Sequence, residues 1–123
     1  HIESKDCEYG NAAFGISGLE TAVALVMDRL VHTEVLQLSK AVALLTSAPA
    51  RILGTEKGTL TPRRAADITI IDPDEVRTVD PRRFYSKGKN TPYKGMQLRG
   101  WPWMTLVAGR IVFKEGSIME MKL

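Results

Sequence analysis

Histidine and cysteine, the side chains that most often bind zinc, are scarce in this sequence. The 123 residues include two histidines, His1 and His32, and one cysteine, Cys7. No H-x-H, H-E-x-x-H or C-x-x-C motif is present, so the usual zinc-binding spacings are missing. We therefore expect no metal ligand and no catalytic residue in this chain. His32 is expected at the surface, just after a helix.

Ser17 lies in the segment GISGL, which resembles the nucleophile elbow G-x-S-x-G. The residue two positions after it is Leu19 rather than glycine, and the preceding CEYGNAAF is a poor strand. Cys7 has no histidine close by in the sequence, which favours a spare thiol over a nucleophile. Ser17 and Glu20 instead match the S-x-x-E capping box, which predicts the start of a helix.

The first half of the chain has the periodicity of helices. Apolar residues at spacings of three and four predict a helix over Leu19–Leu30. A second helix is predicted to begin near residues 33–34. The segment SAPARILG predicts a short third helix, capped by Ser47 and ended by Gly54 in the left-handed conformation.

The second half, beyond about residue 55, has the pattern of strands and turns. The segment ADITIID (residues 66–72) is rich in β-branched residues and predicts a strand that ends at Asp72-Pro73. Residues 84–100 are rich in glycine, proline and lysine and predict a loop. The segment WMTLVAGRIVFKEG predicts a hairpin that turns at residues 108–110.

Trp101 and Trp103 flank Pro102 near the start of this hairpin. In an extended backbone their rings would lie on one side of the strand. Such a pair could stack on a base or a ligand, but it more commonly covers the edge of a core, and we favour the second interpretation.

Composition narrows the class of protein. The net charge is +3, with acidic residues interspersed among the basic ones, which favours a solvated surface over a nucleic-acid interface. No apolar run approaches the roughly 20 residues of a membrane span. The polar start HIESKDCEYG lacks the apolar region of a signal peptide, and one cysteine suits a reducing compartment. We expect a cytoplasmic α+β protein that binds neither nucleic acid nor membrane.

Four segments, taken in order, resemble the C-terminal part of the bacterial (class I) dihydroorotase family, in the amidohydrolase superfamily. They are AAFGISGLETA, LTSAPARILG, KGTLTPRRAADITIID and FYSKGKNTPYKGMQLRGWPWMTLVAGRIVF, and together they cover essentially the whole chain. The run SKGKNTP (Ser86–Pro92) is distinctive. Two departures are Ala13, where the family usually has proline, and Arg63-Arg64, where a glycine is common.

The resemblance implies a fold. Residues 1–55 would be the last loop and helices of a (β/α)₈ metal-dependent hydrolase barrel. Residues 56–123 would form the β-strand-rich part of a small composite domain. Without the barrel, the apolar helix stripes would lose their partner, so we expect the isolated chain to oligomerise, to swap segments or to leave its N-terminal part disordered.

The resemblance also implies an activity, the zinc-dependent interconversion of carbamoyl-aspartate and dihydroorotate in pyrimidine synthesis. The family's zinc ligands are an H-x-H pair, a carboxylated lysine, two further histidines and an aspartate, all upstream of the matched segment. The chain alone is therefore expected to bind no zinc and to be inactive. Its implied contribution is to substrate binding, through the backbone of Phe14 and Gly15 and through His1, which is either the last histidine of an Asp-His-Ala-Pro-His motif or the residue just after it.

Several alternatives stay open at this stage. The parent protein could be a hydantoinase or allantoinase, or an inactive dihydroorotase-like subunit that scaffolds aspartate transcarbamoylase. A homo-oligomer is expected in either case. An independent basic binding module would be revealed by tight, salt-sensitive binding of nucleic acid.

Overall fold

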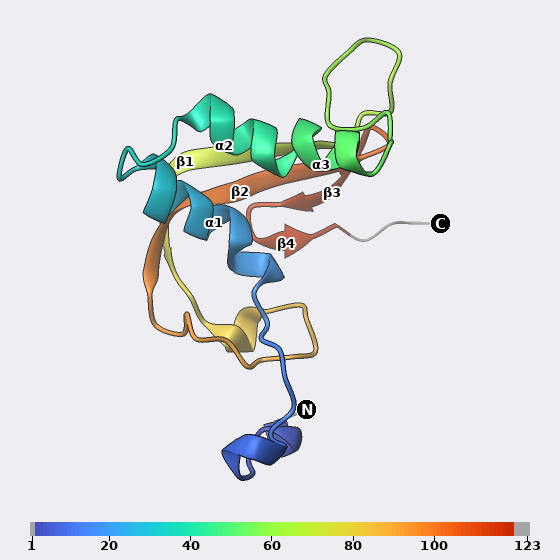
Figure 1. Cartoon of the computed structure of the whole chain (residues 1–123). Coiled ribbons are helices and arrows are strands. Elements are labelled where there is room, and N and C mark those ends of the chain that lie inside the picture. The colour runs from blue at the N-terminus through green and yellow to red at the C-terminus, as the bar shows by residue number, and fades with distance from the viewer. Residues whose placement is uncertain (1, 120–123) are drawn as a thin grey trace.

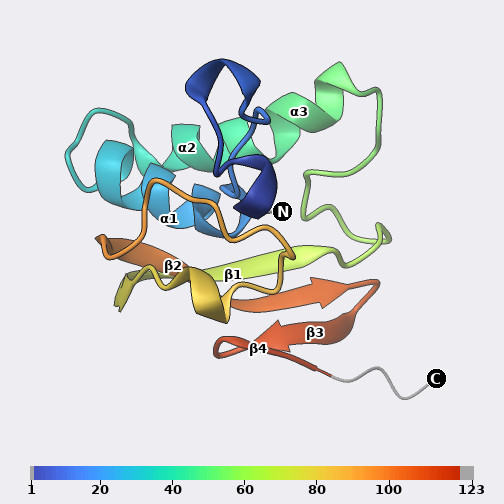
Figure 2. The same ribbon diagram turned by 90° about the horizontal axis from the view of Figure 1, so that it is seen from below.

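The computed structural model describes residues 2–119, which form a helical layer on one face of a four-stranded antiparallel sheet (Figures 1 and 2). The strands, in the order β1-β2-β3-β4, are β1 (Ile68–Thr78), β2 (Gln97–Val107), β3 (Arg110–Lys114) and β4 (Ser117–Ile118). The α-helices are α1 (Ala22–Val26), α2 (Leu38–Leu45) and α3 (Ser47–Ile52). Shorter turns are the 3₁₀ segments η1 (Ile2–Ser4), η2 (Tyr9–Asn11), η3 (Leu19–Thr21) and η5 (Pro81–Arg83), and the π-helical η4 (Met27–Val31).

The helix predicted over Leu19–Leu30 is present as the succession η3, α1 and η4. Ala24 and Met27, one turn apart, are almost fully buried, and the helix packs on β2. Gly100 in β2 permits this approach, because a Cβ atom there would lie 2.4 Å from the Cβ of Met27. A small residue in the strand therefore sets the distance between helix and sheet.

The starts of the next two helices differ from the predictions. The chain does not turn helical at residues 33–34, since Glu34 has a φ of 61° and Gln37 is extended, so α2 begins at Leu38. The third helix includes Ser47, but its hydroxyl makes no N-cap bond and donates to the carbonyl of Ala43, 3.5 Å away. Gly54 adopts the predicted left-handed conformation, with a φ of 64°.

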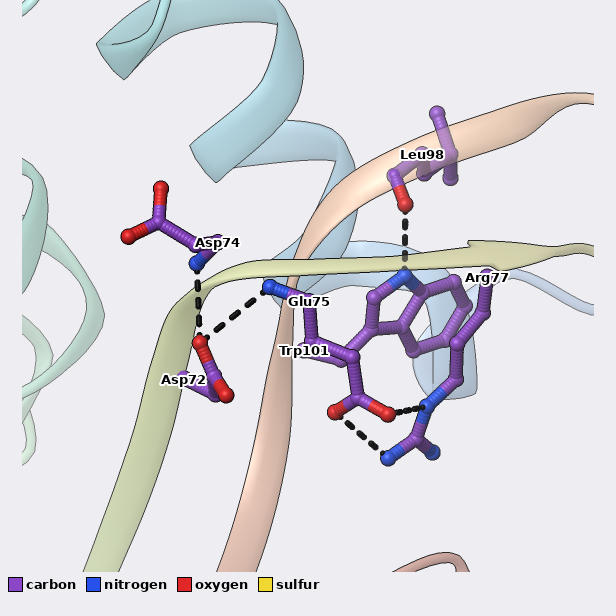
Figure 3. Close-up of polar contacts among 6 residues, drawn as sticks. All are labelled: Asp72, Asp74, Glu75, Arg77, Leu98 and Trp101. Atoms are coloured by element: carbon purple, nitrogen blue, oxygen red, sulfur yellow. Dashed lines mark hydrogen bonds and ion pairs between the residues drawn. The ribbon is translucent and has the colours of Figure 1, made fainter.

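Strand β1 does not end at Asp72-Pro73, as predicted, but continues to Thr78. The register with β2 is interrupted between Asp72 and Val76. Within this interruption the Asp72 carboxylate accepts the backbone N–H groups of Asp74 and Glu75, at 2.9 and 3.1 Å (Figure 3). The aspartate thus satisfies backbone donors that the ladder leaves unpaired, and pairing resumes beyond the proline.

The predicted hairpin is confirmed, with Ala108 and Gly109 as the two residues between β2 and β3. Both have positive φ, 49° and 78°, as a type I′ turn requires. The predicted loop is shorter than expected, because β2 begins at Gln97.

The two tryptophans have different surroundings. Trp101 packs against the buried cluster, and its indole N–H donates to the carbonyl of Leu98 at 2.8 Å (Figure 3). This placement at the edge of the core matches the interpretation favoured above. Trp103 falls at a register shift between β1 and β2, and its ring lies 5.6 Å from the ammonium of Lys114.

The turn at Arg63-Arg64 shows why glycine suits that position. Arg63 has a φ of 70°, in the left-handed region that glycine occupies without strain. Replacing Arg63 by glycine is expected to stabilise the chain by about 0.5 kcal/mol, since relief of the left-handed backbone outweighs the extra entropy of glycine in the unfolded state. The urea midpoint measures this, with Arg64→Gly as the control. That control loses an ion pair with Glu56 and should gain nothing. An unchanged or lower midpoint for Arg63→Gly would contradict the expectation.

The buried core is small and joins both halves of the chain. Ala24, Val79 and Leu98 form its centre. Much of the apolar surface of α2, α3 and the turn after it is exposed, namely Leu38, Val42, Leu44, Leu45, Ile52 and Leu53. The α+β class is therefore confirmed, whereas the place of the helices in a barrel stays a prediction. Within residues 2–119, no helix has the length and apolar character needed to span a membrane.

Candidate substrate-binding loop

The segment that carries Phe14 and Gly15 is an open loop leading into η3. The Phe14 side chain is fully exposed, and Gly15 has a φ of 97°. No heavy atom lies within 4 Å of the place where a Cβ on Gly15 would be, so backbone conformation rather than crowding favours glycine here. The peptide groups of Phe14 and Gly15 therefore lie at the surface, on a side of the loop that the other described residues do not cover.

On its other side the loop is held by the distant segment SKGKNTP. The N–H of Ser17 donates to the carbonyl of Asn90 at 2.6 Å, and the Asn90 amide donates to the carbonyl of Gly15 at 3.4 Å. A Cβ on Gly88 would lie 2.6 Å from the Ser17 hydroxyl oxygen, so the two segments approach closely. These two most distinctive stretches of the sequence, 75 residues apart at Gly15 and Asn90, thus form one unit.

Glu20 ties the same two segments together. Its carboxylate accepts the N–H of Tyr85 at 3.0 Å and that of Ser86 at 2.9 Å. Burial opposes its ionisation, but the hydrogen bonds from Ser86 and Tyr85 and the charge of Lys89 outweigh burial and lower the pKa of Glu20. The predicted capping box is therefore wrong. Gly18 is the residue that precedes η3, and no side-chain hydrogen bond from it caps this turn. Glu20 instead binds the backbone of the distant residues Tyr85 and Ser86.

The N-terminal segment adds a third support. The ammonium of Lys5 donates to the carbonyl of Gly15 at 2.7 Å and also to the carbonyl of Ala13. Among residues 2–119, the N–H groups of Phe14 and Gly15 donate to no backbone carbonyl. The unused groups are thus peptide groups, which can bind a polar ligand but cannot transfer protons as an acid or base would.

The other side chains considered in the sequence, His32 and Cys7, have contacts of their own. His32 bonds through Nε2 to the carbonyl of Pro73 at 2.8 Å, and Cys7 is exposed, with Sγ 3.8 Å from the carbonyl of Ser4. His1 lies outside the described residues, so its expected contact with substrate stays a prediction.

An acidic hollow of about 480 Å³ is also present, lined by Asp72, Asp74, Glu75, Arg77, Trp103 and Glu115. Its carboxylates already have partners, because Glu75 forms a bidentate pair with Arg77 at 2.6 and 2.7 Å, and Asp74 pairs with Arg99 (Figure 3 shows the first pair). In the described part of the chain, no group of three or more His, Cys, Asp or Glu side chains could hold a metal ion. The paired carboxylates of this hollow thus do not fit a zinc centre.

Sequence reasoning identified the loop but missed Lys5, Asn90 and the true partners of Glu20. Asn90 lies within SKGKNTP, which stood out as distinctive, so a signal existed for that residue. Lys5 sits in a polar stretch with no pattern, and only the folded backbone brings it to Gly15.

Comparison with known proteins gives a consistent result. The sequence profile described as the amidohydrolase family matches residues 10–113. The dihydroorotase of Pelotomaculum thermopropionicum is 56% identical over 116 residues, which are 94% of this chain and 27% of that protein. The dihydroorotase of Bacillus cytotoxicus is 46% identical over 88% of this chain and 25% of its own length. The chain thus spans about a quarter of these relatives.

Solved structures agree on the fold. An L-hydantoinase (dihydropyrimidinase) from Arthrobacter aurescens superimposes with a TM-score of 0.86 and 32% identity, over 92% of this chain and 26% of that one. A D-hydantoinase (dihydropyrimidinase) from a Thermus species has a TM-score of 0.82 at 20% identity, over 93% of this chain and 25% of that one, and shows likeness of fold alone.

Proposed function

This chain belongs to the amidohydrolase family, and from that premise we propose that it is part of a dihydroorotase, the enzyme that interconverts carbamoyl-aspartate and dihydroorotate in pyrimidine synthesis. The observation that carries the proposal is its high identity to dihydroorotases along nearly its whole length. The two segments that meet at Asn90 both lie within the matched residues.

In this proposal the chain binds and orients substrate and leaves the bond-breaking chemistry to other parts of the protein. The N–H of Gly15 in the exposed Phe14–Gly15 peptide has no acceptor among residues 2–119, so it can donate to a carbonyl or carboxylate oxygen of the substrate. Gly15, without a side chain, lets the substrate come close to the backbone. His1 is proposed to contact the substrate as well.

Zinc is expected in the complete enzyme, where it would activate a water molecule and polarise the carbonyl of the cyclic amide. We propose that its ligands lie elsewhere in the polypeptide, since the described residues provide no suitable group. No step of the reaction is assigned to the carboxylates of this chain.

The exposed apolar side chains of α2 and α3 support a place for residues 1–55 among the last helices of a barrel, with residues 56–123 in a composite β-domain. Fully burying a leucine or isoleucine side chain contributes about 1.5–3 kcal/mol, and these partly exposed side chains forgo a share of that stabilisation. A covering partner is expected for them. A homo-oligomer, an association with aspartate transcarbamoylase and a cytoplasmic location remain parts of the proposal.

The test is hydrolysis of dihydroorotate by the full-length polypeptide and by residues 1–123 alone. We expect turnover and tightly bound zinc in the full-length protein, and neither in the isolated chain. Equimolar zinc or turnover in the isolated chain would contradict the division of roles.

Substrate preference separates the alternatives. The likeness to an L-hydantoinase structure at 32% identity favours a hydantoinase as second candidate, which would prefer hydantoin or dihydropyrimidine rings to dihydroorotate. A full-length protein that hydrolyses none of these and lacks zinc, yet binds aspartate transcarbamoylase, would be the inactive scaffold.

A further inference from the structure

The carbonyl oxygen of Gly15 receives two hydrogen bonds from opposite ends of the chain. Lys5 donates to it from the N-terminal segment at 2.7 Å, and the amide of Asn90 donates to it at 3.4 Å from the SKGKNTP segment. Asn90 also accepts the N–H of Ser17 through its own carbonyl, at 2.6 Å. Lys5 further donates to the carbonyl of Ala13.

One backbone hydrogen bond also holds this stretch, because the N–H of Ala13 donates to the carbonyl of Ser4 at 2.9 Å. The side chain of Phe14 is fully exposed and so provides no apolar anchor, and no heavy atom lies within 4 Å of the place where a Cβ on Gly15 would be. Glycine has the widest choice of backbone conformations of any residue, so an untethered Gly15 would rotate among several. The backbone bonds of Ala13 and Ser17 flank Gly15. The side chains of Lys5 and Asn90 hold the carbonyl of Gly15 itself, so these two side chains favour the conformation with a φ of 97°.

We propose that Lys5 and Asn90 are positioning residues for substrate binding, which act by holding the Gly15 carbonyl so that the Phe14–Gly15 peptide faces the substrate. This inference rests on the proposed function of the loop. With the carbonyls of Ala13 and Gly15 occupied, the groups of this stretch without a partner among residues 2–119 are the N–H of Phe14 and the two polar ends of the Phe14–Gly15 peptide bond, namely the carbonyl of Phe14 and the N–H of Gly15. Holding that plane in place spares the substrate the cost of ordering it.

The test compares Lys5→Met and Asn90→Leu in the full-length polypeptide. Each variant removes a donor and keeps a side chain of similar size. We expect KM for dihydroorotate to rise about tenfold in each, with kcat within about twofold, because the contact is made equally in the ground state and the transition state. Lys5→Arg keeps a cationic donor and should restore KM to within about threefold of the unmodified value.

Matched controls come from the same two segments. Lys87 and Asn11 are exposed, and their side chains form no hydrogen bond or ion pair within residues 2–119, so Lys87→Met and Asn11→Leu should leave KM unchanged. Equal effects in the controls, a loss confined to kcat, or failure of Lys5→Arg to restore KM would overturn the proposal.

A second readout separates this inference from the proposed function. If the unmodified polypeptide hydrolyses no dihydroorotate, the proposed function fails, and ¹⁵N relaxation of the Gly15 amide then decides the positioning role. We expect lower order at Gly15 in Lys5→Met and Asn90→Leu than in the two controls. Unchanged order would reject the role of both side chains.

Discussion

Replacing Gly100 by alanine is expected to destabilise the fold by about 3 kcal/mol, the largest effect of any single substitution considered for this chain. Two costs combine. Gly100 has a φ of 95°, which an L-residue adopts at a cost of about 1–2 kcal/mol. The new Cβ would also lie 2.4 Å from the Cβ and 2.9 Å from the Cγ of Met27, so helix and strand must separate. Such overpacking typically costs about 1–3 kcal/mol.

Gly95→Ala is the matched control for this prediction. Its φ of 80° carries the same kind of strain, yet no atom lies within 4 Å of the added Cβ. Urea unfolding, followed by tryptophan fluorescence, should show a loss of only about 1–2 kcal/mol for Gly95→Ala. Equal losses for the two variants would mean that the close contact between Met27 of η4 and Gly100 of β2 does not limit the stability of the fold.

The helical periodicity of Leu19–Leu30 and the turn at Ala108-Gly109 could be predicted because each depends on residues close together in the sequence. The helix stripe and the left-handed turn residues are local signals, and the structure retains both. Local residue patterns determine the type of element, so it was predictable. The side-chain partners depend on contacts between distant segments, so they were not.

One error arose because a local signal competed with a distant partner, and the other because a local turn did not end the strand. Ser17 and Glu20 have the spacing of a capping box, but the carboxylate of Glu20 binds N–H groups 65 and 66 residues away. Asp72-Pro73 reads as a strand end, yet Asp72 satisfies the backbone donors that follow, so the strand resumes. Neither outcome can be derived from spacing, because the first depends on distant backbone groups and the second on the pairing of β1 with β2 beyond the turn.

The candidate loop was likewise only half predictable. Phe14 and Gly15 were identified through resemblance, since their backbone groups leave no chemical signature in the sequence. The supports of the loop depend on the approach of the SKGKNTP segment, which glycine at position 88 permits by leaving room for the Ser17 hydroxyl. The need for glycine at position 88 becomes evident only when the structure shows how closely Ser17 approaches it.

Glu20→Gln is expected to destabilise the chain by about 2 kcal/mol at neutral pH, because the carboxylate accepts two N–H groups and charged acceptors are worth about 1.5–3 kcal/mol. The amide of glutamine keeps one acceptor and turns a donor toward the other N–H. Glu8→Gln is the control, since Glu8 is exposed and its side chain forms no hydrogen bond or ion pair within residues 2–119. Equal unfolding free energies in urea for the two variants would count against the role of Glu20.

The same contact predicts a pH dependence with a definite sign. The folded pKa of Glu20 is lowered, so its contribution is fully present above the unfolded pKa, about 4.3, and is lost as pH falls through the folded value. Hydrogen bonds from Lys57 and Arg82 lower the pKa values of Asp67 and Asp80 as well, so the unmodified chain loses stability in acid for several reasons. The difference in the free energy of unfolding between the unmodified chain and Glu20→Gln isolates the contribution of Glu20. It should be largest at pH 7 and shrink toward zero near pH 2, whereas a constant difference would show that packing rather than charge makes Glu20 important.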